Sequence, residues 1–119
     1  MSLSSGRTER TFQILTVLVD GPLHGYGIIQ EVERLSDGRT QLRVGTLYGA
    51  LERLSGEGLL VLDAEETVSG RLRRYYRLTD TGAQVLAEEA DRLAQQAVVA
   101  LDRLRKRGTL RRAPAGGIV

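Results

Sequence analysis

Positions 71 to 77 read Arg71-Leu72-Arg73-Arg74-Tyr75-Tyr76-Arg77, and the interpretation of the chain depends on this stretch. It follows a turn signal, Ser69-Gly70, and its side chains alternate in character, as they do along a β-strand. One face is apolar and the other is cationic and aromatic, with only Arg74 breaking the pattern. Such a strand suits a sheet that packs on a core and presents its other face to a polyanion.

A short amphipathic helix is predicted just upstream, over residues 46–57. Its buried stripe, Leu47, Leu51 and Leu54, has spacings of four and three residues, and its outer faces carry hydroxyls and one arginine. A helix followed by a basic hairpin is the order of a winged helix-turn-helix that reads DNA. The predicted fold class is therefore mainly α with a small β-hairpin (α+β).

The composition fits one soluble domain. The chain has 119 residues, of which 41% are hydrophobic, so a packed core is feasible. The net charge is only +2, and the distribution of charge is more informative than this sum. Because the sequence has no cysteine and no apolar run of membrane-spanning length, disulfides and thiolate metal sites are excluded and a cytoplasmic protein is expected.

Four helices and a hairpin are predicted along the chain. The helices cover residues 8–19, 24–35, 46–57 and 80–106. The hairpin has strands at 59–64 and 71–78, joined by a loop or wing tip at 65–70. The apolar stripes expected in the first two helices are Phe12, Leu15, Leu18 and Val19, and then Ile28, Ile29, Val32 and Leu35.

The last helix carries a candidate dimerisation seam. Thr79 is a good N-cap, and Asp80 follows in the first turn. Small and apolar side chains then recur at spacings of four and three, which is a heptad pattern. The seam, with Leu101 beside it, is Leu86, Ala90, Leu93, Ala97, Ala100, Leu101 and Leu104.

Three kinds of segment are therefore expected. Residues 8–79 form a DNA-binding domain, and residues 80–107 form a helix that pairs with its mate in a homodimer. Residues 1–7 and 108–119 are expected to be flexible termini.

Catalysis is not supported by the sequence. The one histidine, His24, stands at a helix start without an acidic neighbour, and a packing role explains it better than proton transfer. No glycine-rich phosphate loop and no metal-ligand spacing is found, so neither a cofactor nor a metal is expected.

The residues predicted to contact DNA come from the second and third helices and the hairpin. Helix N-terminal amides and arginines suit phosphates, whereas Arg and Thr on a groove-sized helix suit base edges. Four hairpin arginines, with no acid among them between residues 68 and 78, exceed what solubility needs. The predicted DNA contacts are Gly25, Tyr26, Arg43, Thr46, Tyr48, Arg53, Arg71, Arg73 and Arg74.

Some of these side chains have a second interpretation. Arg53 lies four residues before Glu57, so a surface ion pair and a DNA contact both stay open. Tyr75 suits a core or cross-strand position, and Tyr76, on the apolar face, is assigned to packing. Tyr48 is harder to assign to the core, because the stripe of three leucines is complete without it.

The chain resembles the PadR family of bacterial transcriptional regulators from Ile14 to Leu86. The resemblance rests on several blocks in order, which together are specific. They are Ile14-Leu15, Gly21-Pro22-Leu23-His24-Gly25-Tyr26, Gly45-Thr46-Leu47-Tyr48, Leu51-Glu52-Arg53-Leu54, Gly58-Leu59-Leu60, and Arg74-Tyr75-Tyr76-Arg77-Leu78-Thr79 with Gly82.

The resemblance implies a winged helix-turn-helix homodimer that represses transcription at a palindromic operator. It also implies that the helix with Thr46 and Tyr48 faces DNA together with the Arg71–Arg74 side of the hairpin. The single C-terminal helix is similar to the shorter branch of the family, and the resemblance implies that this helix pairs with its mate.

Two departures from the family pattern bear on function. Gly49 stands where relatives often have proline, and glycine inside a helix costs up to about 1 kcal/mol relative to alanine. Some relatives stack flat aromatic drugs on a tryptophan at the dimer interface, but this chain has no tryptophan. A stacking effector site of that type is therefore not expected here.

Two other functions remain open at the level of sequence. A winged helix also serves as a protein-interaction module, whose arginines would meet an acidic partner, since fold alone does not fix function. A small-molecule sensor is the other possibility, with a pocket at the dimer interface where Ala90 and Ala97 leave space.

Overall fold

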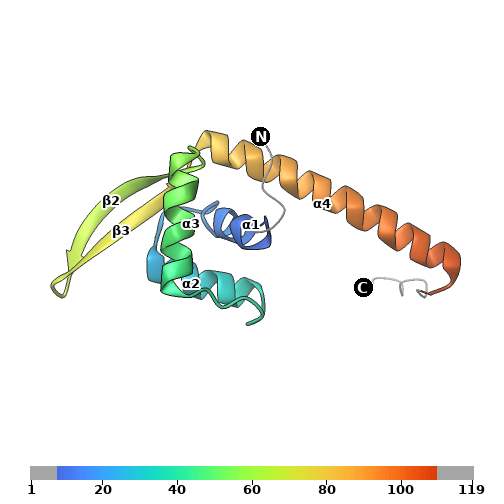
Figure 1. Ribbon diagram of the computed structural model, residues 1–119, viewed down its shortest axis with the longest axis horizontal. Helices are drawn as coiled ribbons and strands as arrows, with labels where there is room; N and C mark the ends of the chain where they lie inside the picture. Colours follow the sequence, from blue (N-terminus) through green and yellow to red (C-terminus); the bar gives the residue numbers. More distant parts are fainter. Residues whose placement is uncertain (1–7, 110–119) are drawn as a thin grey trace. The chain divides into compact units, whose positions relative to one another are not determined.

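The computed structural model describes residues 8–109, so the expected flexible segment 1–7 and most of 108–119 lie outside it. Figure 1 shows the succession of helices and strands. The described elements are α1 (Thr8–Val17), β1 (Leu23–His24), α2 (Gly25–Leu35), α3 (Val44–Gly56), β2 (Leu60–Val68), β3 (Arg71–Leu78) and α4 (Asp80–Arg107).

The predicted fold class is confirmed. Three helices pack with a three-stranded antiparallel sheet in the order β1-β3-β2, and a long helix follows. The hairpin of β2 and β3, which we call the wing, lies beside α3 (Figure 1). None of the helices within residues 8–109 is long and apolar enough to cross a membrane.

The core is built from one side of each of the first three helices and the start of β2. The leucine stripe predicted on α3 is fully buried. Val19 and Leu35, however, were expected in the core and are exposed. Both lie where a helix has ended or is ending: α1 stops at Val17, and Leu35 is the last residue of α2. The buried apolar residues are Ile14, Leu15, Val17, Leu18, Ile28, Val32, Leu42, Leu47, Ala50, Leu51, Leu54, Leu59, Leu60 and Val85.

The wing is longer than predicted, and its turn is shorter. Strand β2 continues through the segment expected to be a loop, so only Ser69 and Gly70 form the turn. Their φ angles are 52° and 78°, as a two-residue turn that matches strand twist requires. A bulge between Leu62 and Ala64 leaves Asp63 out of the regular pairing.

Strand β1 was not predicted. Leu23 pairs with Tyr76, and His24 pairs with Tyr75. These two residues attach the start of α2 to the inner edge of the wing.

The start of α4 was predicted correctly. The Thr79 hydroxyl accepts a hydrogen bond from the Gly82 N–H at 2.9 Å and donates one to the Gly58 carbonyl at 2.6 Å. A Cβ atom at Gly82 would lie 1.9 Å from the carbonyl oxygen of Leu59, the residue just before β2, so α4 approaches this backbone as only glycine permits. Val85 is buried in the core, and Leu86 packs against it.

The chain divides into two compact units at residues 89 and 90. The first turns of α4 thus belong to the unit that contains the core, and the expected domain boundary at residue 79 lies earlier than this division. In the second unit the side chains of the predicted seam are exposed, apart from the partly buried Leu104. Leu93, Val98, Val99 and Leu101 expose large apolar surface there, and dimerisation through this helix stays a prediction.

Candidate nucleic-acid interface

The outer surface of α3 carries the predicted reading residues. Thr46 and Tyr48 are exposed, whereas their neighbour Leu47 is fully buried. Arg43, immediately before the helix, is exposed as well. Nothing lies within 4 Å of where a Cβ would stand on Gly45 or Gly49, so this side of the helix backbone is accessible.

Gly25 and Tyr48 come together from two different helices. A Cβ at Gly25 would lie 2.5 Å from the Tyr48 hydroxyl oxygen, which means that the tyrosine lies directly against the start of α2. Tyr48 nevertheless remains 46% exposed, and Tyr26, next to Gly25, is 64% exposed. Gly25 itself is buried beneath Tyr48, so Tyr48 and Tyr26 are the exposed members of these three predicted contacts.

The N-termini of α2 and α3 have no side-chain caps. His24 and Arg43 occupy the N-cap positions, and neither side chain accepts a hydrogen bond from the helix amides. At α4, by contrast, Thr79 caps the first turn. Uncapped amides at a helix N-terminus are suited to an anion such as a phosphate.

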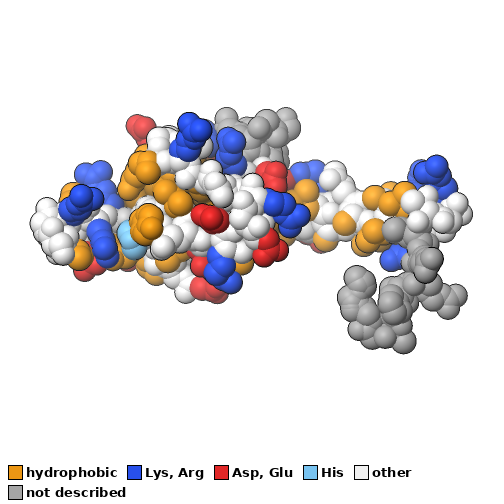
Figure 2. Space-filling model, turned by 90° about the horizontal axis from the view of Figure 1, so that it is seen from below, with side chains coloured by type: hydrophobic (Ala, Val, Ile, Leu, Met, Phe, Trp, Pro, Cys, Tyr) orange, Lys and Arg blue, Asp and Glu red, His pale blue; other side chains and the backbone are white. Residues whose placement is uncertain are grey.

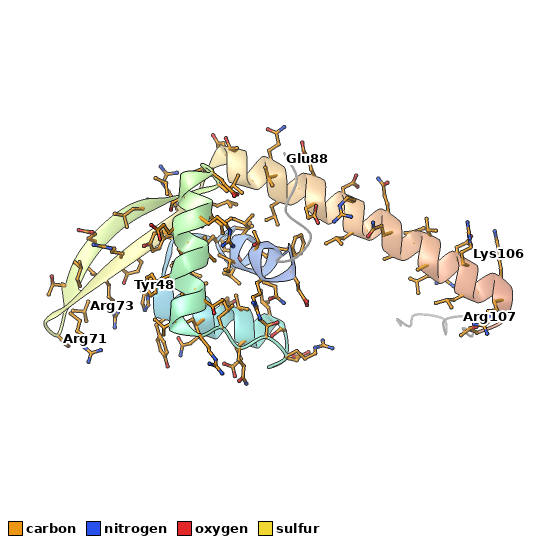
Figure 3. All side chains as sticks on the ribbon, viewed as in Figure 1. Tyr48, Arg71, Arg73, Glu88, Lys106 and Arg107 are labelled. Atoms are coloured by element: carbon orange, nitrogen blue, oxygen red, sulfur yellow. The ribbon has the colours of Figure 1, made fainter. Side chains whose placement is uncertain are left out.

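The wing divides its arginines between two faces. Arg71 and Arg73 lie two residues apart on β3 and so share a face with Tyr75, whereas Arg74 points to the opposite face. In Figure 3 the side chains of Arg71 and Arg73 leave the wing on the same side, and Tyr48 lies on the edge of α3 turned toward the wing. Figure 2 shows basic side chains gathered on the wing end of one face.

The wing arginines also differ in whether an acid compensates their charge. This difference does not follow the face of the strand, because Arg77 lies on the same face as Arg71 and Arg73. Arg74 pairs with Glu65 at 3.1 Å between Nε and Oε2, and Arg77 pairs with Asp63 at 3.1 Å between Nε and Oδ1. Among residues 8–109, neither Arg71 nor Arg73 has an acidic partner or a side-chain hydrogen bond. Their guanidinium groups are exposed and available to an external anion.

Arg53 lies on the same side of α3 as Thr46, seven residues earlier, and is partly exposed, so its contact with DNA stays a prediction. Its Nε atom is buried and has no hydrogen-bond partner in the described part of the chain. That N–H is therefore not presented to a ligand.

His24 is a packing residue, as the sequence indicated. Its ring centroid lies 5.3 Å from that of Tyr75, with the ring planes at 59°. Within the described residues, no group of three or more His, Cys, Asp or Glu side chains is placed to hold a metal ion.

One charged pair on α2 shows a shifted pKa. The hydrogen bond from Arg34 lowers the pKa of the Glu31 carboxyl, and the same contact raises the pKa of Arg34. Arg34 is exposed and Glu31 is partly exposed, and the two compensate each other, so α2 adds no free cation here.

An apolar hollow of about 500 Å³ opens where α1 ends and α4 begins. Its size lies in the range of small-molecule sites. The side chains that line it are mostly aliphatic, with Arg77 and Asp80 as the charged exceptions; the aliphatic members are Leu18, Val19, Leu78, Ala83, Leu86 and Ala87.

Comparison with known proteins identifies the family. Residues 14–88 match the family described as "Transcriptional regulator PadR-like family". The chain belongs to the PadR-like family. Members of this family are transcriptional regulators rather than enzymes.

Two curated relatives of this PadR-like chain differ in length. The "Transcriptional regulator Rv3488" of Mycobacterium tuberculosis is 38% identical over 91 residues, which cover 76% of this chain and 81% of that protein. An "Uncharacterized 37.1 kDa protein in transposon TN4556" of Streptomyces fradiae is 44% identical over 82 residues, or 69% of this chain. The chain spans only 22% of the Streptomyces protein.

A solved structure shows the same fold. The PadR of Bacillus subtilis, crystallised in complex with operator DNA, matches with a TM-score of 0.62 at 24% identity. The match covers 69% of this chain and 47% of that one. At this identity the likeness shows the winged-helix fold of the PadR-like chain.

One contact of the surface was missed at the level of sequence. Tyr75 donates a hydrogen bond from its hydroxyl to Glu66, a residue that was placed in a loop. The sequence could have indicated this contact. With a two-residue turn at Ser69-Gly70, the pairing counted outward from the turn places Glu66 opposite Arg73, next to Tyr75 on the same strand face.

Proposed function

We propose that this chain is a sequence-specific DNA-binding transcriptional regulator that acts as a homodimeric repressor, relieved by an effector. One observation carries the proposal. Two uncompensated arginines, Arg71 and Arg73, share a surface with Tyr48 and the uncapped start of α2. A surface that combines free cations, helix amides and exposed side chains on a groove-sized helix is complementary to duplex DNA.

Each part of the surface has its own role in this proposal. α3 enters the major groove, where Thr46 and Tyr48 contact base edges and Arg43 contacts the backbone. The amides at Gly25 and Tyr26 bind one phosphate, and Arg71 and Arg73 bind others through the wing. Arg74 contributes less than its sequence position suggested, because it lies on the opposite face of β3 from Arg71 and Arg73 and is paired with Glu65.

A selection of genomic DNA fragments, followed by competition with random DNA, tests this function. We expect a palindromic site with half-sites about one helical turn, or roughly 34 Å, apart. Thr46→Ala and Tyr48→Ala should each lose discrimination between the selected site and random DNA, by about tenfold for one base contact.

Two outcomes of this selection contradict the proposal. Equal losses on both DNAs would reject base reading by α3. Failure to select any DNA would favour the protein-interaction module instead.

Homodimerisation is proposed through the exposed part of α4. Leu93 and Leu101 present apolar surface that no part of the described chain covers. Light scattering at micromolar concentration should give about twice the 13.1 kDa of one chain. A particle of 13.1 kDa would contradict the seam.

Repression and its relief complete the proposal. A dimer bound over a promoter excludes polymerase, and an effector that favours a second arrangement of the dimer would release it. The apolar hollow at the start of α4 offers a place for such a molecule. The chain should repress a reporter gene placed under the selected site. Increased expression would show that the chain is an activator and would contradict the proposed repression.

A further inference from the structure

Three acidic residues of β2 lie within reach of three arginines of β3, and only two of the possible ion pairs form. Glu65 lies directly opposite Arg74, and the two are paired. Asp63, in the bulge, is paired with Arg77. Glu66 lies directly opposite Arg73 in the same register, but no ion pair joins them.

The carboxylate of Glu66 is held by a different residue. The Tyr75 hydroxyl donates a hydrogen bond to Glu66 Oε1. Tyr75 lies two residues from Arg73 on the same strand face, so it is the diagonal neighbour of Glu66 and can reach it with its long side chain. A hydrogen bond to an ionised carboxylate is stronger than a neutral one, and it competes effectively with an exposed ion pair.

Packing fixes the tyrosine in this position. Its ring lies against His24, with centroids 5.3 Å apart, and His24 is paired with Tyr75 across β1 and β3. The ring is half-buried, whereas Arg73 and Glu66 are exposed. Tyr75 is thus the ordered member of the group, and its hydroxyl determines which way the Glu66 carboxylate turns.

We propose that Tyr75 is a positioning residue for DNA binding, whose hydroxyl holds Glu66 away from Arg73 and so leaves the Arg73 guanidinium free for a phosphate. The inference rests on the proposed function, because it explains how one wing cation stays uncompensated. Without the hydroxyl, Glu66 pairs with the arginine opposite it, as Glu65 does with Arg74. A phosphate then has to displace a carboxylate and bind beside its negative charge.

Tyr75→Phe tests the proposal, because it removes the hydroxyl and keeps the ring that packs on His24. DNA affinity should fall about threefold for each wing, which corresponds to the energy of one exposed ion pair, and therefore about tenfold for a dimer. The dependence of log K on log salt should flatten by up to about 0.9 for each wing, as one phosphate contact is lost. Tyr75→Phe with unchanged affinity and unchanged salt slope would overturn the proposal.

A second substitution distinguishes positioning from loss of structure. Glu66→Gln in the Tyr75→Phe background removes the charge that captures Arg73, so both affinity and salt slope should return to those of the unmodified chain. Glu65→Gln is the matched control, with the same loss of charge one residue away on the opposite face, and it should restore neither. Equal rescue by both substitutions would overturn the proposal, since only net charge would then matter.

A measurement without DNA keeps this inference separate from the proposed function. NMR of the Arg73 side chain in the free protein should show slower exchange of its Nε proton in Tyr75→Phe than in the unmodified chain, because a new partner holds it. Unchanged exchange would overturn the inference even if DNA binds. If DNA does not bind but the exchange slows, the proposed function fails and the contact between Tyr75, Glu66 and Arg73 stands.

Discussion

The base and the tip of the wing are made from the same two strands, yet they differ in how far their side chains are buried and paired. At the base, Tyr76 and Leu78 pack against the core, and Arg77 is paired with Asp63. Near the tip, Leu72 is 56% exposed and Arg71 has no acidic partner in the described chain. The base thus stabilises the fold, whereas the tip keeps charge and apolar surface for something outside the molecule.

The largest difference between the two ends should appear in stability. Tyr76→Ala removes a half-buried aromatic ring from the edge of the core and should lower the free energy of unfolding by roughly 2 kcal/mol, less than for a fully buried ring. Chemical denaturation monitored by circular dichroism measures this value.

Leu72→Ala is the matched change at the tip. Because this side chain is exposed, its removal should change the free energy of unfolding by no more than about 0.5 kcal/mol, and the denaturation midpoint should hardly move. A loss at Leu72 as large as that at Tyr76 would show that the tip is part of the core and would remove the distinction between the two ends.

Local chemistry made part of the fold predictable. The cap at Thr79, which starts α4, was predicted from the residue itself. The leucine stripe of α3 was found from its spacing for the same reason. The close approach at Gly82 was not predicted, because it depends on the position of the Leu59 carbonyl. Val19 and Leu35 fit the apolar spacing of their helices and were therefore misassigned to the core. Val19 lies beyond the end of α1 and Leu35 is the last residue of α2, where the helix no longer turns the side chain toward the core.

Pairing between distant segments was harder to foresee. β1 has only two residues, too few for any periodicity, and it exists because Leu23 and His24 meet the tyrosines of β3. Glu65 was assigned to a loop, so its pairing with Arg74 was missed. Asp63 was placed in a strand, but the bulge that brings it to Arg77 was not foreseen. For this reason the wing arginines were named as a group, and the compensated ones were not separated from the free ones.

The central claim is that uncompensated wing arginines bind DNA phosphates, and the salt dependence of DNA affinity tests it most directly. If two wings engage roughly six phosphates, log K should fall with log salt with a slope near −5. Arg71→Ala with Arg73→Ala should flatten this slope by about 3 to 4, because a dimer loses four contacts. The control, Arg74→Ala with Glu65→Ala, removes an arginine together with its partner and should leave the slope unchanged. A slope that the first pair leaves unchanged, or that the control flattens equally, would contradict the account.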